Sequence, residues 1–256
     1  MKLMERWQLK LSAKEQLRGS WGNMALKSFL MYIIPIGIVW AFMIVVMVVG
    51  FTMTMFSFAA GSKAPYLTTE AGTLALTVIA TVILYAALLF VMMALAFGFV
   101  DSCIRLRNGE VTWVGVIFGK FGMLPKIIKL TLFLLVALVP YMVICGICGA
   151  FPNVFTFLLM LAAAVGYIYV LLRVSMCTYI LLENPYTTAW AAVKQSWYMM
   201  SGHSWRYFVL LLSFLGWMLL AALTMGIGMF WLMPYMEMTT VNFYYDLKQN
   251  LLAAQE

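Results

Sequence analysis

The sequence predicts an all-α membrane protein with six transmembrane helices, arranged as three hairpins that each follow a short interfacial amphipathic helix. Two features of composition predict the class. The chain has 256 residues, of which 65% are hydrophobic and 10% charged, whereas soluble domains are about half apolar and a quarter charged. It also contains several apolar runs of the roughly 20 residues that a bilayer-spanning helix needs. The distribution of lysine and arginine then predicts the topology.

The N-terminal segment, residues 1–28, is too long and too charged for a cleavable signal peptide, because it lacks a short apolar stretch followed by a small-residue cleavage site. Ser12 and Glu15 have the spacing of a capping box, which predicts that a short helix follows Ser12. We therefore expect a cytoplasmic interfacial segment here. The first transmembrane hairpin, 29–100, comes next.

Two further cytoplasmic segments resemble the first. Residues 101–129 begin near the turn Asn108-Gly109 and precede the second hairpin, 130–183; residues 184–206 begin with Asn184-Pro185, a good N-cap followed by proline at the first helical position. Each segment has a glycine with an aromatic residue shortly after it, so we interpret the three as copies of one unit. Aromatic-rich amphipathic helices lie in the membrane interface, and we expect their tryptophans to act as interfacial anchors: Trp21, Trp113, Trp190, Trp197 and Trp205.

The third hairpin, 207–247, depends on how one long apolar stretch is divided. Gly226 and Gly228 flank a single residue within it, and two glycines so close together weaken a helix and permit positive φ. We predict a hairpin turn at these glycines, two short crossings around it, and a cytoplasmic tail at 248–256. A single kinked helix, giving five crossings, is the alternative.

Charge placement favours six crossings. Of the 16 lysines and arginines, only Lys63 lies in a segment expected outside, and fifteen lie in segments expected inside. The positive-inside rule then places both termini in the cytoplasm of a multi-pass protein of the cell membrane. The net charge of +7 is explained by this basic inner face, so we expect no nucleic-acid partner. Instead, we expect contact with the lipid bilayer, in particular with anionic lipids, and leave a membrane-protein partner open.

The segment from Glu183 to Leu247 resembles a bacterial membrane family, domain of unknown function 975, found largely in Gram-positive bacteria. The resemblance rests on Asn184-Pro185, on Gly202 with Trp205, on Gly216-Trp217, and on two longer motifs. These are the turn from Thr224 to Gly228 and the sequence "PYMEMTTVNFYYDL", Pro234 to Leu247. The N-terminal "AKEQLRGSWG" also fits the family's opening. The resemblance implies a membrane protein but no biochemical role.

Glu237 is the acid that most needs explaining, because six crossings place it in or near lipid. An ionised group at the bilayer centre costs roughly 2.5–3.5 kcal/mol on insertion scales, so it usually has a partner or faces water. We predict an intramembrane charge pair in which Arg173 locks its helix to that of Glu237. Asp101, a second acid at an inner helix end, is a candidate for the same group, with Arg105 and Arg107 as further cations.

Other reactive residues give weaker signals. Cys145 and Cys148 form a C-x-x-C pattern, which can be redox-active, but they lie in an apolar helix beside small residues, so helix packing is the favoured interpretation. His203 is the single histidine. The sequence contains no Walker-type loop, zinc-ligand spacing or G-x-S-x-G motif, and its polar stretches are too short for a separate catalytic domain. We therefore expect no enzymatic activity, no cofactor and no metal.

Three functions remain open on these grounds. The favoured one is a non-enzymatic scaffold or accessory protein of the cell envelope that acts through lipid or protein partners. The second is a small transporter or lipid-translocating protein that uses Arg173, Glu237 and Asp101 in a cavity. The third, immunity against or export of a membrane-active peptide, rests on analogy alone. A water-filled cavity at Glu237 would favour transport, and a tightly packed interior would favour the scaffold.

Overall fold

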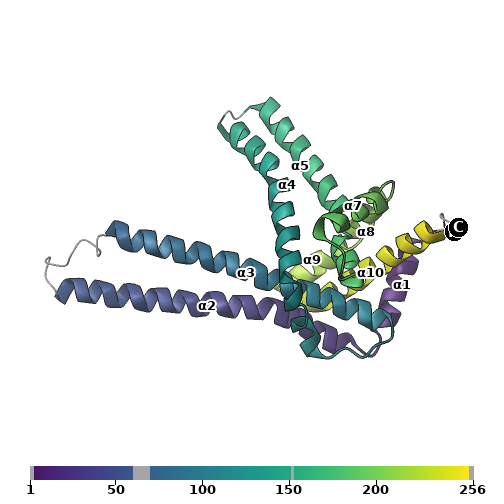
Figure 1. The fold of residues 1–256 in the computed structure, drawn as a ribbon, viewed down its shortest axis with the longest axis horizontal. Coiled ribbons are helices and arrows are strands. Elements are labelled where there is room, and N and C mark those ends of the chain that lie inside the picture. Colours follow the sequence, from purple (N-terminus) through teal and green to yellow (C-terminus); the bar gives the residue numbers. More distant parts are fainter. Residues whose placement is uncertain (1–2, 60–69, 151–152, 254–256) are drawn as a thin grey trace.

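The computed structural model describes residues 3–59, 70–150 and 153–253, and every regular element within these ranges is a helix (Figure 1). The α-helices are α1 (Arg6–Leu17), α2 (Trp21–Ala59), α3 (Glu70–Arg107), α4 (Leu124–Ala150), α5 (Val154–Val174), α6 (Cys177–Glu183), α7 (Ala189–Met199), α8 (Ser204–Leu212), α9 (Leu215–Leu223) and α10 (Met229–Ala253). Two 3₁₀ helices, η2 (Val114–Phe118) and η3 (Phe121–Met123), connect α3 to α4. The predicted all-α class is confirmed.

Five stretches are long and apolar enough to cross a membrane: Trp21–Thr52, Thr77–Arg107, Val114–Gly149, Val154–Glu183 and Ser204–Leu223. They support the predicted membrane protein. The sixth expected crossing lies in α10, which is not among these five stretches. Its polar residues between Thr239 and Asp246 explain why.

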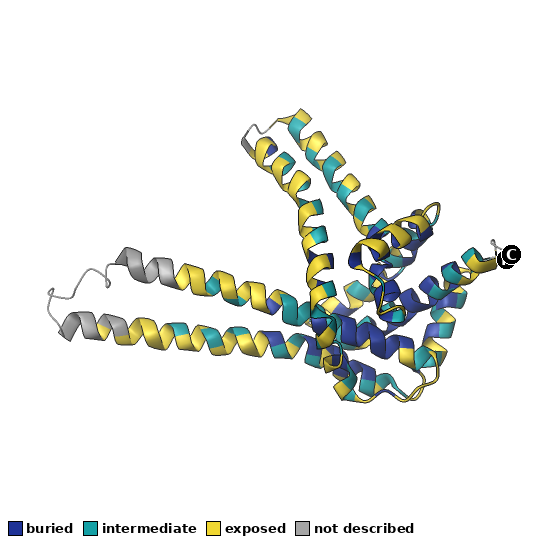
Figure 2. Ribbon diagram, viewed as in Figure 1, coloured by how far each residue is buried: buried dark blue, intermediate teal, exposed yellow. Residues whose placement is uncertain are grey.

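The long hairpins leave a common helical body in different directions (Figure 1). In Figure 2, buried residues gather in this body, whereas exposed ones run along α2–α3 and α4–α5. The helical body consists of α1, the first turns of α2, the last turns of α3, η2, the first turns of α4, and α6 to α10. At 39 residues, α2 is about 58 Å long, well beyond the roughly 30 Å of a bilayer core. Its first turns, with Met24, Lys27, Ser28 and Met31, are buried in the helical body.

The two hairpins bury little of their own apolar surface. Side chains such as Met47 on α2, Ile83 on α3 and Phe155 on α5 are mostly exposed. Contacts between the hairpin partners are present, for example the stacked rings of Tyr141 and Tyr167, whose centroids are 5.5 Å apart. Exposed apolar surface of this extent marks a membrane or partner surface. Lys63 and its loop lie outside the described residues.

The short helices of the first and third predicted segments begin at different residues from those predicted. In α1 the cap is Glu5 with Gln8, so the helix starts at Arg6 and encloses Ser12 and Glu15. The predicted cap was wrong because Glu5 and Gln8 offer the same reciprocal bonding two turns earlier.

The later segments also differ from the prediction. In the third segment, Thr188 caps α7 by accepting a bond from the Ala191 amide at 3.2 Å. Asn184 instead ends α6. In the second segment the chain forms 3₁₀ turns in place of an α-helix.

The fourth apolar run is broken rather than continuous. After Val174 the chain turns before α6 starts at Cys177. Ser196 of α7 compensates for the break, because its hydroxyl donates to the Arg173 carbonyl at 2.7 Å and accepts from the Met176 amide at 3.2 Å. Ser196 is fully buried. The break therefore redirects α6 into the helical body.

A tight turn separates α9 from α10. Gly226 has φ +86°, and the Gly228 amide donates to the Thr224 hydroxyl at 2.8 Å. A Cβ on Gly228 would lie 3.0 Å from the Ala221 Cα. Thr224, Gly226 and Gly228 thus have separate roles: capping, positive φ and close helix approach.

Gly98 on α3 gives a test of how the helical body is packed. A Cβ there would lie 2.1 Å from the backbone oxygen of Ile117 in η2, so Gly98→Ala forces α3 and η2 apart. We expect a marked loss of folded protein after detergent extraction, measured by size-exclusion chromatography. Gly37→Ala is the control, because a Cβ at Gly37 meets nothing within 4 Å. Equal yields from both variants would contradict this packing.

Candidate functional site

The second half of α10 is almost completely enclosed by the body. Between Met238 and Leu247, only Tyr245 is not buried. Four of the enclosed residues are polar: Thr239, Thr240, Asn242 and Asp246. Buried polar groups require partners. Thr239 and Thr240 find theirs in carbonyls of α10 itself, so Asn242 and Asp246 are the residues that must be bonded to the elements around the helix.

Two tyrosine–glutamate hydrogen bonds join α6 to α10. The Tyr179 hydroxyl of α6 donates to the Glu237 carboxylate of α10 at 2.6 Å, and the Tyr244 hydroxyl of α10 donates to Glu183 of α6 at 2.6 Å. The two tyrosine rings stack with centroids 5.4 Å apart. Lys248 adds a charge by bonding Glu183 at 2.5 Å. We refer to Tyr179, Glu183, Glu237 and Tyr244 as the Tyr–Glu clasp.

The predicted partner of Glu237, Arg173, lies elsewhere. Its guanidinium stacks over Trp197 at 4.7 Å and over Tyr169 at 5.4 Å. No ion pair joins Arg173 to Glu237 within the described residues. The break after Val174 is the physical reason, since it leaves Arg173 against α7 and brings Tyr179 to Glu237.

Asp101 makes a separate charge cluster. It pairs with Arg105 on the next turn of α3 at 2.9 Å and with Lys120 at 3.1 Å. Lys120 lies between η2 and η3, so this nearly buried carboxylate fastens the connecting segment to α3. The structure therefore does not bring Asp101 together with Arg173 and Glu237 as one group.

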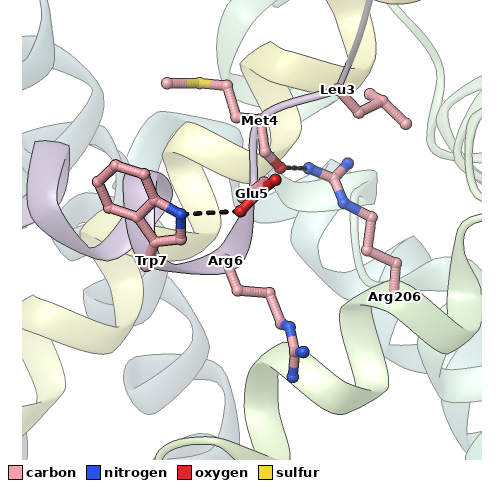
Figure 3. Close-up of a pocket in the computed structure, with 6 residues that line it drawn as sticks. All are labelled: Leu3, Met4, Glu5, Arg6, Trp7 and Arg206. Atoms are coloured by element: carbon pink, nitrogen blue, oxygen red, sulfur yellow. Dashed lines mark hydrogen bonds between the residues drawn. The ribbon is translucent and has the colours of Figure 1, made fainter.

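A latch at the chain ends is the second site on α10. Asp246 accepts hydrogen bonds from the Met4 backbone amide at 3.1 and 3.2 Å and from Arg206 at 2.7 Å. Arg206 also donates to the Met4 carbonyl, as Figure 3 shows. We refer to Met4, Arg206 and Asp246 as the terminal latch. A cavity of about 440 Å³ lies beside it, lined by Leu3, Met4, Glu5, Arg6, Trp7 and Arg206 (Figure 3).

Asn242 connects α10 to two more helices. Its amide oxygen accepts from Arg107 of α3 at 3.1 Å, and its amide nitrogen donates to Gln16 of α1 at 2.9 Å. Arg107 also lies over the Tyr245 ring at 3.9 Å. The α10 segment is therefore tied to α1, α3, α6 and α8 by side-chain contacts.

The tryptophans expected as anchors occupy varied environments. Trp113 and Trp205 are largely exposed, Trp190 packs edge-on against Phe133, and Trp197 lies under Arg173. Trp21 is half-buried and packs near Tyr235, with ring centroids 6.3 Å apart. Nothing here tests whether they anchor in a membrane, so that expectation stays a prediction.

The remaining candidate residues carry no recognisable chemistry. Cys145 and Cys148 are free thiols within α4. Burial, together with the Arg206 charge, lowers the pKa of His203. The described residues contain no group of three or more His, Cys, Asp or Glu side chains placed to hold a metal ion.

Sequence reasoning missed Tyr179, Glu183, Tyr244, Arg206 and Asp246 as contact residues. The signal that could have found two of them, Tyr244 and Asp246, was the density of polar and aromatic residues in "NFYYDL" after an apolar helix. Such a segment is expensive to bury unless each polar group is paired.

A family model described as "Protein of unknown function (DUF975)" matches residues 1–251. The chain belongs to this family. Comparison with curated proteins and with solved structures gives no match. In this DUF975 member, the motif from Pro234 to Leu247 supplies Glu237 and Tyr244 to the Tyr–Glu clasp and Asp246 to the terminal latch. The motif therefore coincides with the contacts that assemble the helical body.

Removal of one hydroxyl tests the Tyr–Glu clasp. Tyr179→Phe leaves Glu237 without its donor, and we expect the free energy of unfolding to fall by about 1–3 kcal/mol, measured by denaturant titration in detergent. Adding Glu237→Leu removes the unpaired carboxylate, so the double variant should lose less than the two single losses combined. Tyr186→Phe is the control, since Tyr186 is 99% exposed. Additive losses would show that the pair is not coupled.

Removal of one charge tests the terminal latch. Asp246→Asn weakens the bonds to Arg206 and the Met4 amide, so the segment before α1 should exchange its amide hydrogens faster. Hydrogen–deuterium exchange over residues 3–9 measures this, and we expect at least a tenfold increase, equivalent to about 1.4 kcal/mol. Glu110→Gln serves as control because Glu110 is exposed. Unchanged exchange in Asp246→Asn would show that the latch does not hold the N-terminal segment.

Proposed function

We propose that this protein is a non-enzymatic scaffold of the cell envelope, in which a rigid helical body presents two apolar hairpins to lipid or to membrane-protein partners. The observation that carries the proposal is that acidic side chains of the body bond one part of the chain to another. Glu183, Glu237 and Asp246 each accept bonds from another helix or segment. Their contacts stabilise helix packing.

The exposed surface supports the same role. The α2–α3 and α4–α5 hairpins expose apolar side chains along most of their length (Figure 2). A scaffold needs such surface, since lipid or partner helices have to cover it. We propose three hairpins in the cell membrane, the third at 207–247 with α8 and α9 as its first crossing and α10 as its second, and both termini in the cytoplasm.

A small transporter or lipid-translocating protein is the second candidate. Glu237 remains partly accessible, and the Lys27 ammonium group is buried without a hydrogen-bond partner. Buried ionisable groups of this kind often belong to transport pathways. Burial of Lys27 without a bonded partner is the observation that favours this candidate.

A scrambling assay separates these two functions. Purified protein is reconstituted into vesicles with a fluorescent phospholipid, and dithionite then bleaches the outer leaflet. A scaffold leaves about half of the fluorescence protected, as in protein-free vesicles. If the unchanged protein allowed further bleaching and Glu237→Gln abolished it, the scaffold would be overturned and lipid translocation established. Proton flux is measured on the same vesicles, where flux lost in Glu237→Gln would have the same consequence.

Cysteine labelling tests the proposed topology. In a background without native cysteines, Met225→Cys should react with a membrane-impermeant maleimide in intact cells, because Met225 is 97% exposed in the turn before α10. Tyr186→Cys should react only after permeabilisation, because Tyr186 is exposed in the turn between α6 and α7. If Met225→Cys and Tyr186→Cys both reacted only after permeabilisation, the turn before α10 would lie inside the cell, and the proposed third hairpin would be wrong.

A further inference from the structure

An aromatic groove lies between α9, α10 and the junction of α1 with α2. Its volume is about 410 Å³, within the usual range for ligand pockets. The groove is lined by Lys14, Trp21, Trp217, Leu220, Ala221, Thr224, Gly228, Trp231, Leu232 and Tyr235. It therefore combines three tryptophans and a tyrosine with one cation, Lys14, in an otherwise nearly apolar wall.

The groove has an apolar end and a charged end. Gly228 and Thr224 belong to the turn that starts α10, and Tyr235 lies seven residues after Gly228, roughly 10 Å along the helix. Lys14 lies over the Tyr235 ring at 5.5 Å. The cation is thus at the opposite end of the groove from the turn.

Lys14 is one member of a basic stripe on α1. Arg6, Lys10, Lys14 and Arg18 follow one another at every fourth position, which places neighbours on one face of a helix. Lys10 lies over Phe214 at 4.1 Å and donates to the Ser213 carbonyl at 3.1 Å. Burial lowers the pKa of Lys10, and the charges of Lys14 and Arg6 lower it further. A stripe of like charges attracts an anion.

We propose that this groove binds one anionic phospholipid, with an acyl chain along Trp217, Trp231 and Leu220 and the phosphate at Lys14. The inference rests on the membrane scaffold proposed above, because it names the lipid class through which the body is held. Charge complementarity selects an anion, and the apolar wall selects a molecule with a hydrocarbon chain.

The environment of the groove fits a lipid. Tryptophan is enriched at membrane interfaces, where its apolar ring can lie against hydrocarbon while its N–H faces polar groups. The helix that forms one wall, α9, also exposes Leu219 and Leu223, so its outer side is apolar as well. A soluble anion would gain nothing from this wall.

Lipid retention measured by native mass spectrometry in detergent tests the proposal. Dioleoylphosphatidylglycerol and dioleoylphosphatidylcholine are titrated separately into the delipidated full-length chain. We expect one phosphatidylglycerol to bind more tightly than phosphatidylcholine. Lys14→Gln should weaken phosphatidylglycerol binding about fivefold, the loss of one surface cation–lipid contact of about 1 kcal/mol.

Lys194→Gln is the matched control. Lys194 is an exposed lysine that lies over Trp190 at 5.5 Å, the same distance as Lys14 from Tyr235. We expect it to bind phosphatidylglycerol as tightly as the unchanged protein. Equal weakening in both variants would overturn the groove as a site, because it would show a general charge effect.

Two further measurements keep the outcomes separate. Trp217→Ala with Trp231→Ala should weaken binding of both lipids, and unchanged binding would place the lipid outside the groove. Inorganic phosphate should not displace phosphatidylglycerol; displacement would identify a free-phosphate site and overturn the lipid. Lipid retention is measured without vesicles or partners. The scrambling assay can therefore reject the scaffold while lipid binding in the groove is confirmed, and the retention assay can reject the groove while the scaffold is supported.

Discussion

Burial of the second half of α10 is the constraint on which the helical body depends. This segment carries four buried polar residues, and buried polar groups need partners. The hydroxyls of Thr239 and Thr240 donate to carbonyls of α10 itself, whereas Asn242 and Asp246 bond other parts of the chain. The partners of Asn242 and Asp246 come from the N-terminal segment, α1, α3 and α8, and the Tyr244 hydroxyl adds a bond to α6. Since an unpaired buried group costs more than its bond gains, all these elements must be in place together. The body is therefore assembled around its last helix.

This dependence separates the body from its hairpins. The hairpins are joined to the body by the ends of α2, α3, α4 and α5, and beyond the body their described side chains are mostly exposed (Figure 2). In water this apolar surface would cause aggregation, whereas in a bilayer the lipid chains solvate it. Polar contacts thus specify the body, and hydrophobicity alone specifies the hairpins.

That division decides what could be predicted from sequence. Hydropathy predicts the apolar helices well, and Gly226 with Gly228 marks the turn region between α9 and α10, because both signals are local. The cap of α1 was misplaced because Glu5 with Gln8 and Ser12 with Glu15 share one spacing. The partner of Glu237 could not be predicted, because it depends on the direction of α6 after the break at Val174. Ser196, twenty residues away, stabilises that break.

The choice of tyrosine over arginine for Glu237 has a physical rationale. A buried ion pair must offset the desolvation of two charges, and its net contribution is often small. A phenol loses far less hydration than a guanidinium, yet it donates a charge-assisted bond to a carboxylate. The reciprocal bond from Tyr244 to Glu183 and the stacking of the two rings fix the rotation of α6 against α10. A carboxylate held in this way has one oxygen committed to packing, which is the property that a rigid scaffold requires and that a proton or substrate carrier would have to break in every cycle.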